Sequence, residues 1–109
     1  MFYNCPNIID IDLSNFDATN TTILYRMFNK CTNLKKVNLS NFCTKNVINM
    51  GLLFTNCYNL ESIDLSSFDT NKVTNMDSMF SNCHILEKIN VSLFDTHNVK
   101  KMIFMFKNC

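Results

Sequence analysis

The stretch that decides the fold reads NLESIDLSSFDT over residues 59–70 and MFSNC over residues 79–83. Both phrases recur along the chain at a step of 26 residues, and self-similarity of this kind indicates a repeat architecture. The fullest columns are Cys5, Cys31, Cys57, Cys83 and Cys109; Phe2, Phe28, Phe54, Phe80 and Phe106; and Phe16, Phe42, Phe68 and Phe94. The sequence therefore predicts one domain over 1–109, built from four repeats (1–26, 27–52, 53–78 and 79–104) and the start of a fifth.

Two periodicities alternate within each repeat. Leu34–Ser40 alternates between apolar and polar residues, which predicts a strand with one buried face. The second half of a repeat places apolar residues at helical spacing, with candidate N-caps before them. One such stretch runs from the third repeat into the fourth. Its helical positions are Val73, Met76, Met79, Phe80 and Cys83, and the candidate caps are Asp69, Thr70 and Asn71.

A single repeat is too small to fold alone, because ordering its backbone costs more free energy than its few apolar side chains return. Stacking covers the open flanks of each repeat and pairs its strand with the next. We therefore expect an α/β fold: a right-handed leucine-rich-repeat solenoid with a short parallel sheet on its concave side and short helices on its convex side.

The repeat resembles known families. Leu34-x-x-Val37-x-Leu39 is similar to the core motif of leucine-rich repeats, and the phrases over residues 59–70 and 79–83 resemble the BspA-like leucine-rich repeat surface proteins, a type found in mycoplasma lipoproteins. The resemblance covers all 109 residues, although Ile85 stands where the other repeats carry Asn. It implies a surface-exposed role in adhesion or interaction, often within a longer array.

The composition of the chain argues against several classes of protein. Hydrophobic residues make up 47% of the chain and charged residues 17%, so disorder is not expected. The net charge of +1 predicts no long-range attraction to nucleic acid, and we interpret Lys30, Lys35 and Lys36 as solvated surface. No apolar run approaches the roughly 18–20 residues of a membrane span, so no direct membrane insertion is expected. Met1–Asp12 shows no secretory signal.

The cysteine column allows three interpretations: small buried core residues, disulfides between repeats, or metal ligands. Core packing is favoured, because uniform spacing supplies no C-x₂₋₄-C pairs and disulfides need close backbones. Cys43 stands outside the column, where other repeats carry Asp, and is interpreted as a neutral substitution rather than a reactive thiol.

No arrangement of residues indicates catalysis. His84 and His97 lie in different columns without a recurring nucleophile, and the single glycine, Gly51, is incompatible with a glycine-rich phosphate loop. The sequence therefore predicts a protein that is not an enzyme and that has no catalytic residue, metal site or cofactor.

The outward side chains of the predicted strands are the candidate ligand-binding surface, since the concave face of such arrays commonly binds partners. A simply solvated sheet face is the alternative. The candidate residues are Asp10, Asp12, Ser14, Lys36, Asn38, Ser40, Ser62, Asp64, Ser66, Lys88, Asn90 and Ser92.

Both ends of the sequence fall in the same phase of the repeat and carry no polar cap, so we expect a fragment of a longer array. The predicted function is a non-catalytic module that binds a protein or other macromolecule. By the resemblance it serves in adhesion or host interaction at the cell surface or outside the cell. An intracellular, cytoplasmic scaffold for protein–protein interaction is the alternative.

Overall fold

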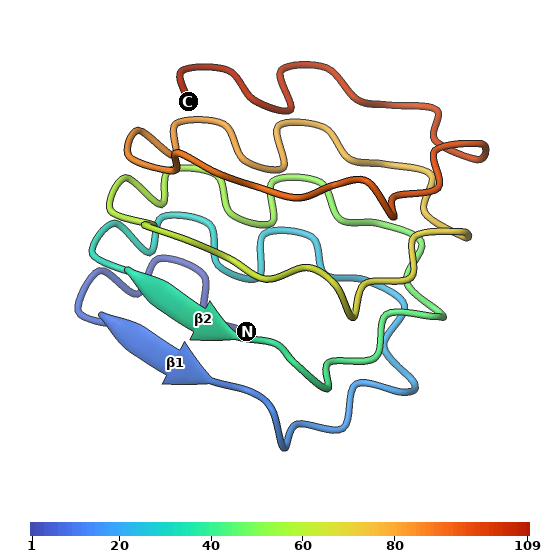
Figure 1. Cartoon of the computed structure of the whole chain (residues 1–109), viewed down its shortest axis with the longest axis horizontal. Helices are drawn as coiled ribbons and strands as arrows, with labels where there is room; N and C mark the ends of the chain where they lie inside the picture. Colours follow the sequence, from blue (N-terminus) through green and yellow to red (C-terminus); the bar gives the residue numbers. More distant parts are fainter.

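The computed structural model describes residues 1–109 and contains two β-strands, β1 (Asp10–Asp12) and β2 (Lys36–Asn38), which pair in parallel. Asp10 pairs with Lys36, so the register equals the 26-residue step of the sequence. Single parallel bridges continue this register elsewhere, joining Ile23, Asn49, Asn75 and Lys101 in turn. Each 26-residue winding, here called a coil, lies against the next, from the first (blue) at one end to the last (red) at the other (Figure 1).

The helices predicted for the second half of each repeat are wrong, because the chain contains no α-helix. The N–H of Met79 donates to the Met76 carbonyl at 3.3 Å, which closes a tight turn instead of a helical i to i−4 bond. The neighbouring N–H of Ser78 donates at 2.8 Å to the carbonyl of Ile103 in the following coil. Backbone donors therefore alternate between local turns and the next coil.

Two residues with left-handed backbone, four positions apart in each repeat, explain why no helix forms. Ser78 and Asn82 have φ of 52° and 63°, and a residue in this conformation typically ends an α-helix. The predicted cap Asp69 instead accepts the Asn71 N–H at 3.0 Å and closes a side-chain turn. The left-handed residues form two columns: Asn4, Lys30, Asn56, Asn82 and Asn108; and Arg26, Leu52, Ser78 and Phe104.

The sheet is also smaller than predicted. Residues 62–66 and 88–92 keep the alternation of outer and inner side chains but form no strand. Only one backbone bond, from the Glu61 N–H to the Lys35 carbonyl at 3.1 Å, joins the second and third coils along this side. The Leu39 carbonyl further along accepts the Ser67 hydroxyl at 2.8 Å.

The predicted α/β leucine-rich-repeat solenoid is therefore wrong as an architecture. There are no convex helices, the sheet has two strands of three residues each, and the molecule measures 32 × 31 × 22 Å. What the structure shows is a compact body of turns whose successive coils hydrogen-bond to one another.

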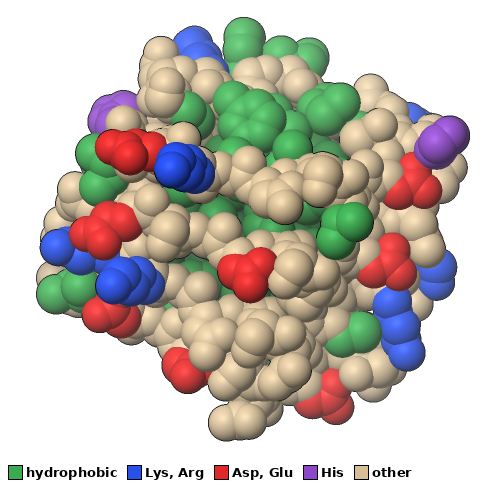
Figure 2. Space-filling model, viewed as in Figure 1, with side chains coloured by type: hydrophobic (Ala, Val, Ile, Leu, Met, Phe, Trp, Pro, Cys, Tyr) green, Lys and Arg blue, Asp and Glu red, His purple; other side chains and the backbone are tan.

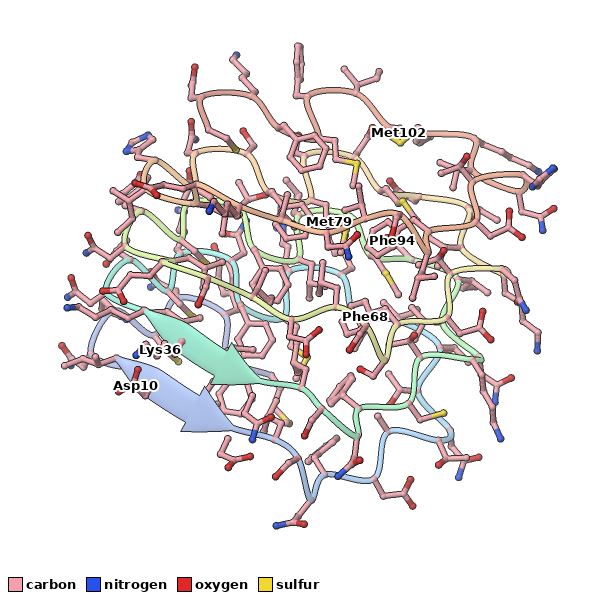
Figure 3. The ribbon with its side chains drawn as sticks, viewed as in Figure 1. Asp10, Lys36, Phe68, Met79, Phe94 and Met102 are labelled. Atoms are coloured by element: carbon pink, nitrogen blue, oxygen red, sulfur yellow. The ribbon has the colours of Figure 1, made fainter.

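The core consists of side-chain columns that run from coil to coil. One of the two columns of phenylalanines forms a continuous stack, here called the phenylalanine column. Its rings lie within 7° of parallel with centroid distances from 5.1 to 5.6 Å, and its members are Phe2, Phe28, Phe54, Phe80 and Phe106. Val73, Met76 and Met79, which were expected on a helix, are completely buried beside it. Tight turns therefore direct these side chains inward as a helix would. The second column of phenylalanines follows the same register. In Figure 3, its members Phe68 and Phe94 occupy the same position of successive coils.

Candidate interaction surface

The twelve side chains predicted to bind a ligand lie along β1, β2 and the two extended segments in the same register. Eleven of them are exposed, and Ser14 is half-buried. Figure 3 places Asp10 and Lys36 next to each other on the two strands. The set forms three columns: Asp10, Lys36, Ser62 and Lys88; Asp12, Asn38, Asp64 and Asn90; and Ser14, Ser40, Ser66 and Ser92. We call this set the polar face.

The middle column of the polar face has a structural role that the sequence reasoning missed. Asp12 Oδ1 accepts the Ser14 N–H at 2.8 Å, and Asp64 Oδ1 accepts the Ser66 N–H at 2.9 Å. Asn38 makes the same turn in the second coil. The recurring order of Asp or Asn two residues before Ser is the sequence signal for such a turn. The column thus fixes the end of each extended segment.

These turns also lower the pKa of the two carboxyl groups in the middle column. Hydrogen bonds from the side chain and the backbone of Ser14 hold the pKa of Asp12 below its usual value. The backbone and side chain of Ser66 lower the pKa of Asp64 in the same way. Both carboxyl groups therefore stay ionised to a lower pH than an ordinary Asp, and each is held in one orientation.

The outermost column carries the positive charges of the polar face. Lys36 and Lys88 are exposed and take part in no ion pair, whereas the neighbouring Lys35 pairs with Glu61 at 3.4 Å. Asp10 lies beside Lys36 in the strand register, yet the two side chains form no ion pair. A ligand that carries negative charge would therefore meet two unpaired ammonium groups on this side.

A threonine ladder crosses the opposite corner of the coils. The Thr44 hydroxyl accepts the Asp69 N–H at 2.8 Å and donates to the Asp69 carbonyl at 2.9 Å. Thr70 bridges the N–H and carbonyl of Asp95 in the same way, at 2.8 and 3.1 Å. Both threonines are buried, so the ladder replaces backbone pairing between coils at this corner.

The first coil interrupts this ladder at Ala18, which has no hydroxyl to bridge Cys43. Cys43 itself is a half-buried free thiol at the corner.

An asparagine ladder runs through the other turns, where the Asn82 amide donates to Asn56 at 2.7 Å and the Asn108 amide donates to Asn82 at 2.8 Å. Lys30 occupies the equivalent place in the second coil.

The cysteine column lies largely in the core, as the sequence predicts. Cys31, Cys57 and Cys83 are buried, Cys5 is half-buried and Cys109 is exposed, and none is in a disulfide. The thiol of Cys57 donates to the Phe28 carbonyl at 3.2 Å, and that of Cys83 donates to the Phe54 carbonyl at 3.3 Å. Burial raises the pKa of Cys83 to about 12 and the pKa of Cys57 further still. These thiols therefore act as neutral donors between coils.

The two histidines make different kinds of contact. The ring of His84 stacks on Tyr58 with centroids 5.0 Å apart, whereas His97 Nδ1 lies 2.7 Å from the Asp95 carboxylate. No group of three or more His, Cys, Asp or Glu side chains is placed to hold a metal ion.

The structure has one pocket, with a volume of about 190 Å³, at the first coil. Seven of its eight lining residues are hydrophobic. Tyr25 is its only titratable side chain, so it offers no acid–base pair. The lining residues are Met1, Phe16, Thr21, Ile23, Leu24, Tyr25, Met27 and Phe42. The fold also includes no helix with the length and hydrophobicity needed to span a membrane.

Comparison with protein families gives a match over the whole chain, residues 1–109, to the model described as Mycoplasma protein of unknown function, DUF285. The chain belongs to this family. Neither the curated proteins nor the solved structures gave a match. The description of the family assigns no function.

Proposed function

We propose that this DUF285 protein is a non-catalytic binding module that presents its polar face to a partner protein at the cell surface. The polar face is a regular array in which one column of side chains is fixed by turns and a neighbouring column carries free charges. The BspA-like leucine-rich repeat surface proteins, which the sequence resembles, supply the expectation of adhesion or host interaction.

The observation that carries this proposal is the pair of unpaired lysines, Lys36 and Lys88, beside side chains held in fixed turns. Fixed side chains lose little conformational entropy when a ligand binds, so a preorganised face gains affinity. The two lysines stand two coils apart, which corresponds to roughly 10 Å at the spacing of parallel strands. This arrangement suits a partner that displays carboxylates at a similar interval.

Each contact of this kind is weak, because exposed ion pairs are worth only about 0–1 kcal/mol. The face has no aromatic or arginine anchor of the sort that dominates tight interfaces. Useful affinity therefore requires several such contacts at once, which repeated coils supply through multivalency.

A catalytic role has little support from the same surface. The one pocket is apolar, and the buried thiols are neutral because burial raises their pKa. The Asp carboxylates with lowered pKa are exposed and accept hydrogen bonds from adjacent turns. We propose that the protein is not an enzyme and uses no cofactor.

An intracellular scaffold for protein–protein interaction is the second candidate, favoured by six cysteines that are all free. Free thiols persist in reducing compartments. Antibodies against the chain separate the two candidates: labelling of intact cells supports the surface role, whereas labelling that requires permeabilised cells supports the scaffold.

The polar face is tested by the double variant Lys36→Glu/Lys88→Glu, measured against a panel of immobilised extracellular-matrix proteins. We expect the affinity for any bound protein to fall at least about tenfold, because two attractive contacts become repulsive. The melting temperature should not fall, since neither lysine makes an ion pair in the fold. Lys45→Glu/Lys100→Glu, at exposed positions away from the polar face, is the control. Equal affinity of both double variants and the unmodified chain would place binding elsewhere.

A further inference from the structure

The centre of the polar face is formed by the two inner coils. Lys36 and Asn38 lie on β2, Ser62 and Asp64 lie at the same positions of the following coil, and all four side chains are exposed. Each of the four has a coil on either side, because the residues 26 positions before and after it belong to the structure. We call these four side chains the central square.

Two opposite charges occupy diagonal corners of the central square. Neighbouring coils stand about 4.8 Å apart and two residues of an extended segment span about 6.6 Å, so the Cα atoms of Lys36 and Asp64 are roughly 8 Å apart. The two side chains form no ion pair with each other. The ammonium group and the carboxylate are therefore both available to a partner.

The Asp64 carboxylate is held in one orientation by its turn, since its Oδ1 accepts the Ser66 N–H at 2.9 Å. A carboxylate has about four acceptor sites, so one backbone hydrogen bond leaves it able to accept others. A guanidinium group donates two parallel N–H bonds in a fixed fork and matches a carboxylate better than an ammonium group does. Asp64 therefore suits an arginine of the partner.

A partner of uniform charge fits the central square poorly. The neighbouring Lys35 pairs with Glu61 at 3.4 Å, and Lys36 is balanced by Asp64, so these four residues together carry no net charge. Figure 2 shows acidic and basic side chains interspersed over the side of the molecule that carries β1 and β2. Carboxylates alone would be repelled by Asp64, and basic groups alone would be repelled by Lys36. A surface of this kind selects a partner with the complementary arrangement of both signs.

We propose that the polar face binds an extended segment of a partner protein that carries an acidic and a basic side chain on the same side. The acidic side chain contacts Lys36, and the basic one, an arginine, contacts Asp64. Side chains two residues apart in an extended segment point to the same side and stand about 6.6 Å apart, and the long stems of Lys and Arg span the remaining distance. The inference rests on the proposed function and names the chemistry of its partner.

Three short synthetic peptides of equal length test this chemistry on the 109-residue chain by NMR titration. The mixed peptide alternates Arg and Glu on one side of an extended segment, with Thr on the other side. The second peptide carries only Arg at the charged positions, and the third carries only Glu. We expect the mixed peptide to bind at least about threefold more tightly than either uniform peptide, because exposed ion pairs each contribute little. The amide resonances of Lys36, Asn38, Ser62 and Asp64 should shift most.

Variants of the two charged corners should change the order of the three peptides. Asp64→Asn keeps the turn, which Asn already makes at Asn38, and removes one charge. The preference for the mixed peptide over the Glu-only peptide should disappear in this variant. Lys36→Glu should instead remove the preference for the mixed peptide over the Arg-only peptide.

Asp69→Asn is the matched control for Asp64→Asn. Asp69 Oδ1 accepts the Asn71 N–H at 3.0 Å in a turn of the same kind and in the same coil, but Asp69 lies outside the polar face. The control changes the net charge equally and should leave the order of the three peptides as it is in the unmodified chain.

Equal affinity for the three peptides, tightest binding of a uniform peptide, or shifts outside the central square would overturn the mixed-charge partner, as would the absence of any shift. If the Glu-only peptide bound most tightly and shifted the same resonances, the polar face would still be a binding surface, but one for an acidic partner. The proposed function is judged separately, by Lys36→Glu/Lys88→Glu against the matrix proteins.

Discussion

The inner coils and the last coil carry the same pattern of residues but differ sharply in burial. Phe54 and Met76 are completely buried, whereas their equivalents in the last coil, Phe106 and Met102, are 43% and 47% exposed. The local sequence is nearly the same in both places. Burial is therefore supplied by the neighbouring coils, and the stability of any one coil depends on contacts on its two sides.

The largest effect should come from removing one ring of the phenylalanine column in an inner coil. Phe54 stacks on Phe28 and on Phe80, at 5.1 and 5.6 Å. Phe54→Ala should lower the free energy of unfolding by about 3–5 kcal/mol through lost burial and a cavity. Urea unfolding followed by circular dichroism measures this.

Phe106→Ala is the matched variant in the last coil, where the ring stacks only on Phe80 and is partly exposed. It should cost about 1–2.5 kcal/mol, less than the inner variant, because the ring loses one aromatic pair and only part of the burial. Equal losses for Phe54→Ala and Phe106→Ala would mean that the coils do not depend on two neighbours.

The threonine ladder offers a second contrast between the inner coils and the first. Thr70→Ala removes a buried hydroxyl and leaves the Asp95 N–H and carbonyl without their partner, which should cost about 1–3 kcal/mol. Ala18→Thr should extend the ladder to Cys43 and raise the free energy of unfolding by about 1 kcal/mol.

Thermal and urea unfolding of the two threonine-ladder variants measure this contrast. The two changes should be opposite in sign, because one breaks a bridge and the other makes one. A loss of stability in Ala18→Thr would show that the first coil has no room for the hydroxyl and would remove the ladder as an explanation.

The sequence predicted correctly which side chains share a column. The prediction of a helix failed, because a helix and a series of tight turns place the same residues in one column. Apolar residues spaced like Val73, Met76, Met79 and Phe80 fit both a helix and a series of tight turns, because both return the chain to one side after about three residues. The turns require left-handed residues, which glycine usually marks. Here Leu52 and Phe104 adopt that conformation, although neither residue type favours it, so the sequence did not indicate it.

The sequence predicted which residues of the polar face are exposed, but it did not predict their hydrogen bonds. Strict alternation in Leu34–Ser40 places Lys36, Asn38 and Ser40 outside, and all three are exposed. Alternation gives no information about hydrogen bonds, so the turn between Asn38 and Ser40 was missed. The two-residue spacing of Asp or Asn and Ser in every coil was the available signal.

The smallest expected effect concerns acid and contrasts coils that use Asp with coils that use Asn at the same turn. The folded chain holds the pKa of Asp12 and Asp64 below the value of about 3.9 expected in an unfolded chain. A lowered folded pKa stabilises the fold above the unfolded pKa, and this contribution is lost as the pH falls through the folded pKa. Asp12→Asn/Asp64→Asn keeps the acceptor that Asn38 and Asn90 already provide and removes the ionisation.

The free energy of unfolding of this double variant, measured in urea at pH 7 and pH 3, should fall less between the two than that of the unmodified chain. Asp17 and Asp95 lie in turns of the same kind, remain in the variant and keep part of the dependence, because hydrogen bonds from Thr19 and His97 lower their pKa as well. Asp10→Asn removes a carboxylate of the polar face that accepts no hydrogen bond, and it is the control for a change in net charge alone. If the control variant lost the acid dependence as fully as the double variant, net charge rather than the turns would govern stability in acid, and the contrast between Asp and Asn coils would have no energetic meaning.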